Sequence, residues 1–375
     1  MSSRLNAHDL TERQATLALC ALPGVGPVTA RKLLAAFEQD PRAVLAGDVA
    51  RLRHVDGVGP ATLKALQDWS NRIDPHALEE RMQANAVEFV LEEETGYPPL
   101  LRRIYDPPLG LYRQGPALPT EKTVAFVGTR AASRYGLGVA HEFAAHLAAR
   151  GYCIVSGLAR GVDAAAHEGA LQAGGMTAAV LGSGIDVIYP PEHLDLYRRV
   201  AETGVLFSEF TLGRAADRNT FPMRNRLISG MARAVLVVET GIRGGSLITA
   251  RAAADQNRDV YAIPGRIDQP SSEGCHALIR EGAILVGSVN DLLDELEGAG
   301  QQTDLPLSAP KELPDDLSAD ERAVMEALSG GATLSPDALA EGCRLPPSTV
   351  AAVLMLLEIK TLVAKLPDGR FEALL

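Results

Sequence analysis

The sequence predicts an α/β protein whose central domain is a doubly wound parallel sheet, with a helical domain before it and a small helix-and-strand domain after it. Its 375 residues, 46 % of them hydrophobic and 22 % charged, suffice for two or three globular domains. Between residues 121 and 290, short apolar runs such as TVAFVGTR and AVLVVET alternate with helical stretches, which is typical of a parallel sheet covered on both faces. The polar, proline-containing segment 298–316 predicts a linker to the last domain.

An internal repeat marks the N-terminal domain, residues 1–75. LPGVGPVTARKLL occupies 22–34 and VDGVGPATLKALQ occupies 55–67. Each copy predicts a helix, a glycine turn and a second helix, which resembles the helix-hairpin-helix motif, whose turn offers backbone N–H groups to a DNA phosphate. The possible DNA contacts here are Gly24, Gly26, Gly57 and Gly59. Because this segment has a net charge of only +1, a helical domain that uses its turns for packing alone is an equal alternative.

The C-terminal domain, residues 317–375, has the pattern of a winged helix-turn-helix. Three helices are predicted, followed by two strands around the Asp368-Gly369 turn. The candidate recognition helix, 347–358, contains no Lys or Arg, and residues 311–375 carry 6 basic and 11 acidic side chains. Such a module has few groups that could hold phosphates. The pattern favours a protein-docking or structural role, and a transcription regulator is the weaker alternative.

The net charge of −11 argues at first against a nucleic-acid partner, but the basic residues are unevenly distributed. Residues 121–290 carry 17 basic and 16 acidic side chains, and six arginines fall in one 30-residue stretch. They are Arg214, Arg218, Arg224, Arg226, Arg233 and Arg243, opposed only by Asp217 and Glu239. Because a guanidinium can donate paired hydrogen bonds to phosphate, this cluster is a candidate phosphate site, with solvated surface arginine as the alternative.

Missing patterns exclude several classes of protein. The four cysteines are too scattered for a metal site or a disulfide framework. No apolar run is long enough to span a membrane, and the first residues lack the apolar core of a signal peptide, so a cytoplasmic location is expected. The sequence contains no GxxxxGK[ST], GxSxG or HExxH, and GSGIDV at 182–187 lacks the third glycine of a dinucleotide fingerprint. We therefore assign no catalytic residue, metal or cofactor.

Glycine-rich loops follow several of the predicted strands. In a parallel sheet such loops meet at the carboxyl edge, where backbone N–H groups and helix N-termini favour an anion. The loops are Gly128-Thr129-Arg130, the segments 156–161 and 182–184, and Gly244-Gly245-Ser246. The arginine cluster also begins after a predicted strand, VLFSEF, so Arg218, Arg224 and Arg226 should surround the same crevice, with Phe221 between them. Several cations suit successive phosphates and an aromatic ring suits a base, which favours single-stranded nucleic acid; packing of Phe221 in the core is an equal alternative.

The motifs as a set resemble the DNA processing protein A family, also called Smf. VGTR, SGLARGVDAAAH, GSGIDVIYP, SEF, FPMRNRLISG, VVET, GGSLITA, AIPG and GCHALIREGA occur in the order of that family and, with YPPLLRRIYDPPLGLYRQG before them, cover residues 97–286. The resemblance implies an extended Rossmann domain with a SAM-like helix-hairpin-helix domain before it and a winged helix after it. It also implies a homodimer without enzymatic activity that binds single-stranded DNA, loads a RecA-type recombinase during natural transformation and recombination, and opposes single-strand-binding protein.

The same resemblance carries over roles for individual residues. Arg130 and Arg218 would hold phosphates, Phe221 would line a base pocket, and the surface for dimerisation and recombinase docking would lie beyond about residue 233. The candidate DNA-binding residues are therefore Gly128, Arg130, Gly157, Arg218, Phe221, Arg224, Asn225, Arg226, Gly244, Gly245 and Ser246.

We expect the domain boundaries to be 1–75, 86–297 for the Rossmann domain, 298–316 for the linker and 317–375. Strand signals in residues 86–118 predict additions to the edge of the sheet. The alternative function is a nucleotide-processing hydrolase of the lysine-decarboxylase-like Rossmann group. That group uses a PGGxGTxxE motif, and the nearest segment here, RGGSLITAR at 243–251, has no glutamate in place.

Overall fold

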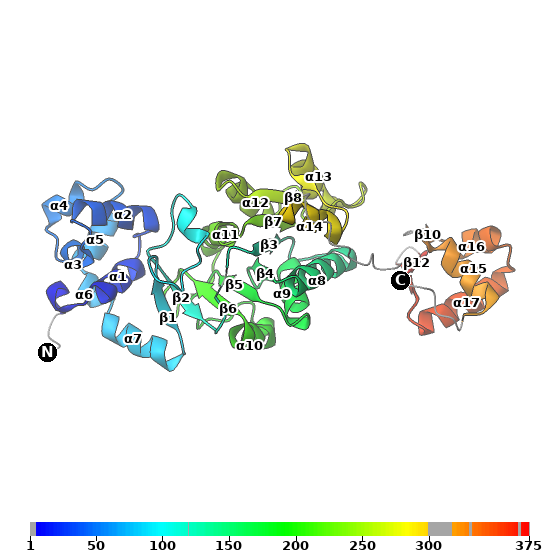
Figure 1. Cartoon of the computed structure of the whole chain (residues 1–375), viewed down its shortest axis with the longest axis horizontal. Coiled ribbons are helices and arrows are strands. Elements are labelled where there is room, and N and C mark those ends of the chain that lie inside the picture. The colour runs from blue at the N-terminus through cyan, green and yellow to red at the C-terminus, as the bar shows by residue number, and fades with distance from the viewer. Residues whose placement is uncertain (1–4, 119, 299–316, 330–331, 367–368, 375) are drawn as a thin grey trace. The chain divides into compact units, whose positions relative to one another are not determined.

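The structure is a computed structural model that describes residues 5–118, 120–298, 317–329, 332–366 and 369–374 (Figure 1). It contains two compact units, Met1–Gly300 and Gln301–Leu375. The predicted linker, 298–316, lies outside the described residues except for its first position.

The first unit begins with a helical domain built on the sequence repeat. Its helices are α1 (Glu12–Ala21), α2 (Pro27–Ala36), α3 (Pro41–Leu45), α4 (Val49–Arg53), α5 (Pro60–Gln67), α6 (Trp69–Arg72) and α7 (Pro75–Ala84). The turn glycines Gly24 and Gly57 have φ angles of +82° and +90°, a conformation that other residues rarely adopt. Each turn packs against the other copy, Gly24 against Thr62 of α5 and Gly57 against Thr29 of α2. The two hairpins therefore form one paired unit with internal symmetry.

A nine-stranded sheet forms the body of the first unit, in the order β1-β2-β6-β5-β4-β3-β7-β8-β9. The strands are β1 (Glu88–Leu91), β2 (Gly110–Gln114), β3 (Thr123–Val127), β4 (Cys153–Ser156), β5 (Thr177–Leu181), β6 (Val205–Ser208), β7 (Ala234–Val237), β8 (Asp259–Ala262) and β9 (Ile284–Leu285). Strands β3 to β9 pair in parallel, and β1 and β2 add an antiparallel edge. The predicted fold class is confirmed, and residues 86–118 do extend the sheet.

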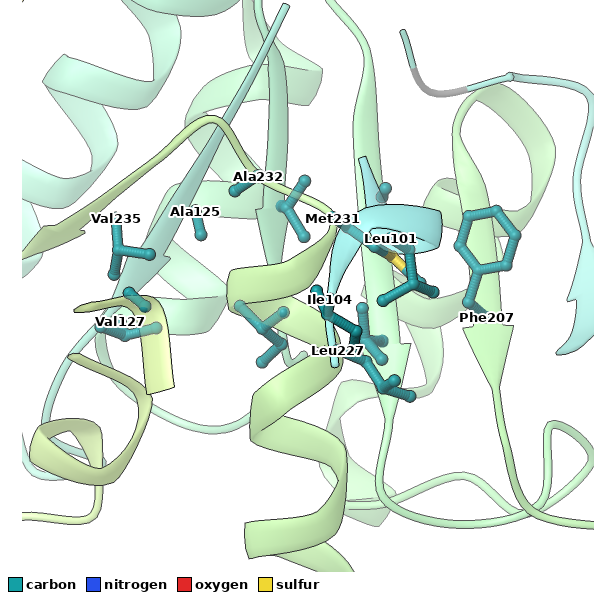
Figure 2. Close-up of a cluster of buried hydrophobic side chains, with 14 of the residues drawn as sticks. Leu101, Ile104, Ala125, Val127, Phe207, Leu227, Met231, Ala232 and Val235 are labelled. Carbon is teal, nitrogen blue, oxygen red and sulfur yellow. The ribbon is translucent and has the colours of Figure 1, made fainter. Parts of the chain in front are cut away.

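Helices cover both faces of this sheet. They are α8 (Arg134–Ala149), α9 (Val162–Gln172), α10 (Leu194–Thr203), α11 (Thr220–Gly230), α12 (Ser246–Asp255), α13 (Glu273–Arg280) and α14 (Val289–Glu297). The side chains of β3 alternate between the two faces: Ala125 and Val127 pack with Leu227 of α11, whereas Val124 and Phe126 face α8, α9 and α14. Figure 2 shows the first of these clusters, in which α11 lies against the sheet. Burial on both faces explains why the strands are continuously apolar.

The strand order reverses beside β3. Strands β3 to β6 follow one another in one direction, and the chain then returns to place β7 on the other side of β3. In open α/β sheets, ligands bind outside the carboxyl ends of the strands at such a switch point. A ligand is therefore expected at the loops after β3 and β7 and at the neighbouring loops after β4, β5 and β6.

The second unit is a small helix-and-strand domain. It contains α15 (Ala319–Ala327), β10 (Thr333–Leu334), α16 (Pro336–Cys343), α17 (Pro347–Ile359), β11 (Val363–Lys365) and β12 (Phe371–Ala373). The three strands form one antiparallel sheet, so the predicted winged helix is confirmed with one strand more than expected. Asp368 of the predicted turn lies outside the described residues. No single described helix is long and apolar enough to cross a membrane; α16 and α17 reach that length and composition only as a pair, and the pair is bent by 111°.

His167 of α9 is fully buried between the strands and the helix. Its Nδ1 lies 2.7 Å from Oγ1 of Thr177, whose hydroxyl donates a 2.8 Å hydrogen bond to the carbonyl of Ile154. The hydroxyl therefore accepts from Nδ1–H, and among the described residues Nε2 has no partner. Burial, with a smaller contribution from the positive charge of Arg224, lowers the pKa of His167 to about 3.

This burial predicts a specific loss of stability in mild acid. In the unfolded chain, His167 has a pKa of about 6.5 and binds a proton below that pH. In the native state it stays neutral down to about pH 3. Relative to a His167→Leu variant, the free energy of unfolding of the unmodified protein should fall by about 2 kcal/mol between pH 7 and pH 5. Urea denaturation at both pH values measures this difference. A difference that does not change with pH would contradict the buried neutral state.

Candidate nucleic-acid interface

Five loops and the start of α11 converge at the carboxyl edge of the sheet. A Cβ on Gly128, after β3, would overlap Val162 of α9 and would lie 3.0 Å from the carbonyl of Glu239, after β7. A Cβ on Gly182, after β5, would lie 2.9 Å from the ring of Phe221. These glycines therefore allow close approach of neighbouring segments, and the predicted convergence of the loops is present.

Phe221, in the first turn of α11, lies at the centre of a stack of side chains. The guanidinium carbon of Arg130 is 4.5 Å from the centroid of its ring, and the ring of Tyr189 lies 5.6 Å away at a tilt of 44°. Arg130 is exposed and Tyr189 is 38 % exposed. Below the ring is a hollow of about 10 Å³, room for about one water molecule, bordered by the loops after β4 and β5. The phenyl ring thus forms part of the wall of this hollow.

Arg224 lies under this stack and is only 3 % exposed. Its Nη1 donates a 2.9 Å hydrogen bond to the carbonyl of Val180, and its Nε has no partner among the described residues. A Cβ on Gly157 would overlap the guanidinium, so the glycine makes the space for it. Burial lowers the pKa of Arg224 to about 10, which still leaves it charged at neutral pH, and the nearby carboxyl of Asp163 counteracts this effect. The expectation that Arg224 lies on the rim of the crevice is therefore corrected: it lies in the floor.

Arg226, unlike Arg224, does not border the crevice. Its Nη2 donates hydrogen bonds of 2.6 Å to both carboxyl oxygens of Glu209, and its Nη1 donates to the carbonyl of Asp106 at 2.8 Å. The carboxylate of Asp106 lies 3.3 Å from Nε. With two acidic partners, Arg226 ties α11 to the segment before β2, and its charge is neutralised by the protein itself.

Internal carboxylates occupy two positions that a phosphate was expected to take. Glu239, 4 % exposed, accepts hydrogen bonds from the backbone N–H of Ser133 at 3.1 Å and from its hydroxyl at 2.7 Å, at the N-terminus of α8. Asp163 accepts from the N–H of Gly157 at 3.1 Å and of Ala159 at 3.4 Å. The N-terminus of a helix attracts anions, and at α8 the carboxylate of Glu239 is that anion. Three N–H groups on or next to the β3 and β4 loops, those of Ser133, Gly157 and Ala159, are thus engaged by carboxylates of the protein.

The predicted site residues of the loop after β7 differ in exposure. Gly244 packs so closely on Thr240 that a Cβ would overlap its hydroxyl, and the buried Ser246 donates a 2.6 Å hydrogen bond to the same hydroxyl. Gly245, by contrast, is exposed with open space around it. Gly244 and Ser246 shape the loop, and Gly245 is accessible.

Arg130 and Arg218 are both exposed; Arg130 lies over the ring of Phe221, and Arg218 lies three residues before Phe221 in the chain. Within the described residues, the side chains of Arg218 and Arg130 make no hydrogen bond or ion pair, and the guanidinium of Arg130 contacts the ring of Phe221. Asp217 next to it is engaged elsewhere, because it pairs with Arg214 and accepts from the N–H groups of Asn219 and Thr220 at 2.7 and 3.1 Å. Asn225 is half-buried, and its side chain makes no hydrogen bond in the described part of the chain.

Three residues of this site were not identified from the sequence. Tyr189 follows the GSGIDV segment, and its position one residue before Pro190 gives no signal that it meets Phe221. Asp163 and Glu239 are single acidic residues whose burial depends on tertiary contacts. The described residues contain no group of three or more His, Cys, Asp and Glu side chains that could hold a metal ion.

The fold and the site define a doubly wound α/β protein whose switch point is closed by its own carboxylates and whose exposed edge offers arginine and aromatic side chains. Residues 88–297 match the model of the family described as DNA recombination-mediator protein A, residues 308–369 match the DprA winged helix domain, and residues 16–68 match the SAM-like helix-hairpin-helix tandem. The chain belongs to the DNA recombination-mediator protein A family, as the resemblance of its motifs predicted. This membership does not favour the alternative of a nucleotide hydrolase.

Relatives support the assignment over nearly the whole chain. The protein Smf of Synechocystis is 33 % identical over 96 % of this chain and 99 % of its own length, and a putative DNA processing protein DprA of Mycobacterium tuberculosis is 43 % identical over 71 % and 69 %. Among solved structures, DNA processing protein A of Streptococcus pneumoniae is similar with a TM-score of 0.65 and 35 % identity, covering 76 % of this chain and 98 % of that one. The protein of the same name from Helicobacter pylori, solved to explain its mode of binding single-stranded DNA, has a TM-score of 0.51 and 28 % identity, covering 56 % and 96 %.

Gly157→Ala should destabilise the protein, because the added methyl group overlaps the buried guanidinium of Arg224, whose hydrogen bond to the Val180 carbonyl would be disturbed by a shift. Overpacking of this kind costs about 1 to 3 kcal/mol of unfolding free energy. Gly245→Ala is the matched control, since its Cβ would meet nothing within 4 Å. Its unfolding free energy should change by less than about 0.5 kcal/mol. Urea denaturation compares the two, and equal effects would contradict the close packing.

Proposed function

We propose that the protein is a non-catalytic binder of single-stranded DNA and that the strand lies across the carboxyl edge of the sheet, over Phe221. The observation that carries the proposal is the stack of Arg130, Phe221 and Tyr189, with the unpaired Arg218 three residues before Phe221. Bases stack on aromatic side chains whatever their sequence, and arginine binds the phosphates between them. A duplex has its bases stacked on one another, so only a single strand can use such a surface.

The weak contacts of the stack allow a base to enter it. Arg130 is held over the ring only by a cation–π contact, which at an exposed site is worth about 0.5 to 1 kcal/mol. When Arg130 turns to a phosphate, the face of Phe221 becomes free for a base.

A free nucleotide fits the same edge less well. Glu239 occupies the N-terminus of α8, the kind of position at which Rossmann folds bind a nucleotide phosphate, and Asp163 accepts from N–H groups of the β4 loop. The groups that remain exposed at this edge include the arginines Arg130 and Arg218 and the ring of Tyr189. Such an arrangement favours a polymer with several phosphates and bases.

We further propose that the bound strand is passed to a RecA-type recombinase in natural transformation and recombination, in opposition to single-strand-binding protein in the cytoplasm. Membership of a family described as recombination mediators supports this role. So does the similarity to the Helicobacter pylori protein, which was solved for its binding of single-stranded DNA.

Phe221→Ala and Arg218→Ala should each weaken the binding of a labelled oligo-dT, measured by fluorescence anisotropy over a series of salt concentrations. Loss of a stacking surface costs about 1 to 3 kcal/mol, so Phe221→Ala should raise the Kd about tenfold. Arg218→Ala should also reduce the slope of log K against log salt by about 0.7, because one phosphate contact is lost. The control is Arg198→Ala on α10, an exposed arginine that has no ion pair among the described residues and should leave the Kd unchanged. Equal Kd values for all three variants would refute the proposed site.

We propose that the protein forms a homodimer through the β9 end of its sheet, which has the features of a self-association surface. Strand β9 is the last in the order and has an unpaired edge. Ile267 is 93 % exposed and Leu285 of β9 is 52 % exposed, and both border an open hollow of about 580 Å³. Apolar side chains so exposed around one hollow mark an interaction surface.

Ile267→Glu combined with Leu285→Glu should therefore shift the protein from dimer to monomer, because two charges would be buried without partners at the interface. Sedimentation velocity measures the change in mass. Tyr105→Glu serves as the control, since Tyr105 is 90 % exposed on the other side of the sheet order, before β2. If the double variant and the control sediment alike, this face is not the dimer interface.

For the winged helix we propose a protein partner. The exposed face of α17 carries Met355, Leu356 and Ile359, which are 65 %, 50 % and 70 % exposed, and the helix contains no Lys or Arg. A helix that reads DNA presents polar and basic groups to the groove. An apolar face supports docking to protein instead.

A further inference from the structure

Tyr135, in the first turn of α8, is an exposed aromatic residue that the site proposed above does not use. It is 58 % exposed. Its hydroxyl donates a 3.3 Å hydrogen bond to the carbonyl of Pro264, in the loop after β8. This bond ties the far end of the ring to the protein and leaves much of the side chain accessible. A ring that is held in place and open to solvent is suited to stacking with a base.

The sheet order places Tyr135 and Phe221 along the same carboxyl edge. Gly182, close to the ring of Phe221, follows β5, and Pro264, which holds Tyr135, follows β8. Strands β4, β3 and β7 lie between them, so four strand spacings of about 4.8 Å, about 19 Å in all, separate the two ends. A stacked strand advances about 3.4 Å per nucleotide. A single strand of about six nucleotides therefore spans both rings.

Contacts with the β7 loop fix the turn of α8 that carries Tyr135. The carboxylate of Glu239, after β7, accepts a 2.7 Å hydrogen bond from the hydroxyl of Ser133, just before the helix. A Cβ on Gly136 would overlap the same carboxylate, so the residue after Tyr135 has to be small. Together with the bond to Pro264, these contacts set the position of Tyr135 from the loops of two neighbouring strands, β7 and β8.

The loops between the two rings carry unpaired positive charge. The acidic residues in the loops after β3, β7 and β8 are Glu239, which is buried, and Asp268, which pairs with Arg266. Arg243 in the β7 loop is exposed, as is Arg134 beside Tyr135. Within the described residues, the side chains of these two arginines make no hydrogen bond or ion pair. Both are therefore available to phosphates.

We propose that Tyr135 is a second stacking platform for the same DNA strand, and that Arg134 and Arg243 bind phosphates next to it. The strand runs from Phe221 across the loops after β3 and β7 and places a further base on the ring of Tyr135. Stacking and phosphate contacts do not depend on the base, so this part of the site takes single-stranded DNA of any sequence. The inference rests on the proposed function, because Phe221 holds the other end of the bound segment.

The first test compares Tyr135→Ala with Tyr135→Phe and with the matched control Tyr105→Ala, all in the full chain. Tyr105 is 90 % exposed and lies before β2, away from the proposed path. Binding of oligo-dT of about 20 nucleotides, longer than the span of the two rings, is measured by fluorescence anisotropy. Tyr135→Ala should raise the Kd about tenfold, because one stacking surface is lost. Tyr135→Phe keeps the ring and should restore most of the binding, and Tyr105→Ala should bind like the unmodified protein.

A salt series separates the role of the ring from that of the arginines. Arg134→Ala and Arg243→Ala should each reduce the slope of log K against log salt by about 0.7, because each removes one phosphate contact. Tyr135→Ala should leave this slope unchanged, since stacking releases no counterion. An unchanged slope in both arginine variants would overturn their assignment to phosphates.

Pro264 also borders the hollow proposed for the dimer, so sedimentation velocity is measured for the same variants. The mass of Tyr135→Ala should equal that of the unmodified protein. Three results would overturn the inference: equal Kd values for Tyr135→Ala and Tyr105→Ala, binding by Tyr135→Phe as weak as that of Tyr135→Ala, or a loss of affinity that accompanies a loss of dimer mass. Failure of the proposed function is distinguishable, because then Phe221→Ala would leave the Kd unchanged.

Discussion

Arg224 fixes the first turns of α11 against the sheet, because its buried guanidinium donates to the Val180 carbonyl at the end of β5 and fills the space that Gly157 leaves open. The carboxyl of Asp163 offsets the charge and at the same time holds the N–H groups of the β4 loop. Removing either partner would leave a buried charge alone, which is among the most costly changes a core can suffer. Because α11 is held in this way, Phe221 in its first turn lies over the glycine loops. Arg218 lies in the exposed segment just before the helix.

Two groups can be distinguished among the arginines of this protein, those paired with carboxylates inside the fold and those exposed without such a partner. Arginines that build the fold are paired with carboxylates, as Arg226 is with Glu209 and Asp106, and the carboxylates of Glu239 and Asp163 occupy the N–H groups where related folds bind small phosphates. Arg130 and Arg218 are exposed and have no carboxylate partner among the described residues; Arg130 lies over the ring of Phe221, and Arg218 lies three residues before that ring in the chain. An acidic chain with a net charge of −11 can therefore present a local surface for a polyanion, and it suits a polymer better than a nucleotide.

The sequence predicted the fold well, because alternation of apolar strands and helices and the repeat of the glycine turns are local patterns, and each was confirmed in β3 to β9 and in the paired hairpins. The convergence of the loops followed from the geometry of parallel sheets. The positions of Arg224 and Arg226 could not be predicted, since spacing along the chain does not tell whether an arginine points to solvent or to a carboxylate supplied by a distant segment. Asp106 is 120 residues from Arg226 in the chain, and Glu239 is 106 from Ser133. The partner of Phe221, Tyr189, was missed for the same reason.

The central claim is that a base of single-stranded DNA stacks on Phe221 at the carboxyl edge of the sheet. Photo-crosslinking of the full chain to an oligo-dT that contains 5-iododeoxyuridine, followed by mass spectrometry of the linked peptides, tests it most directly, because this base reacts with the aromatic side chain on which it is stacked. We expect adducts on Phe221 or Tyr189, suppressed by an excess of unlabelled single strand and not by duplex. Adducts confined to residues 1–75 or to the winged helix, with none on these two rings, would contradict it.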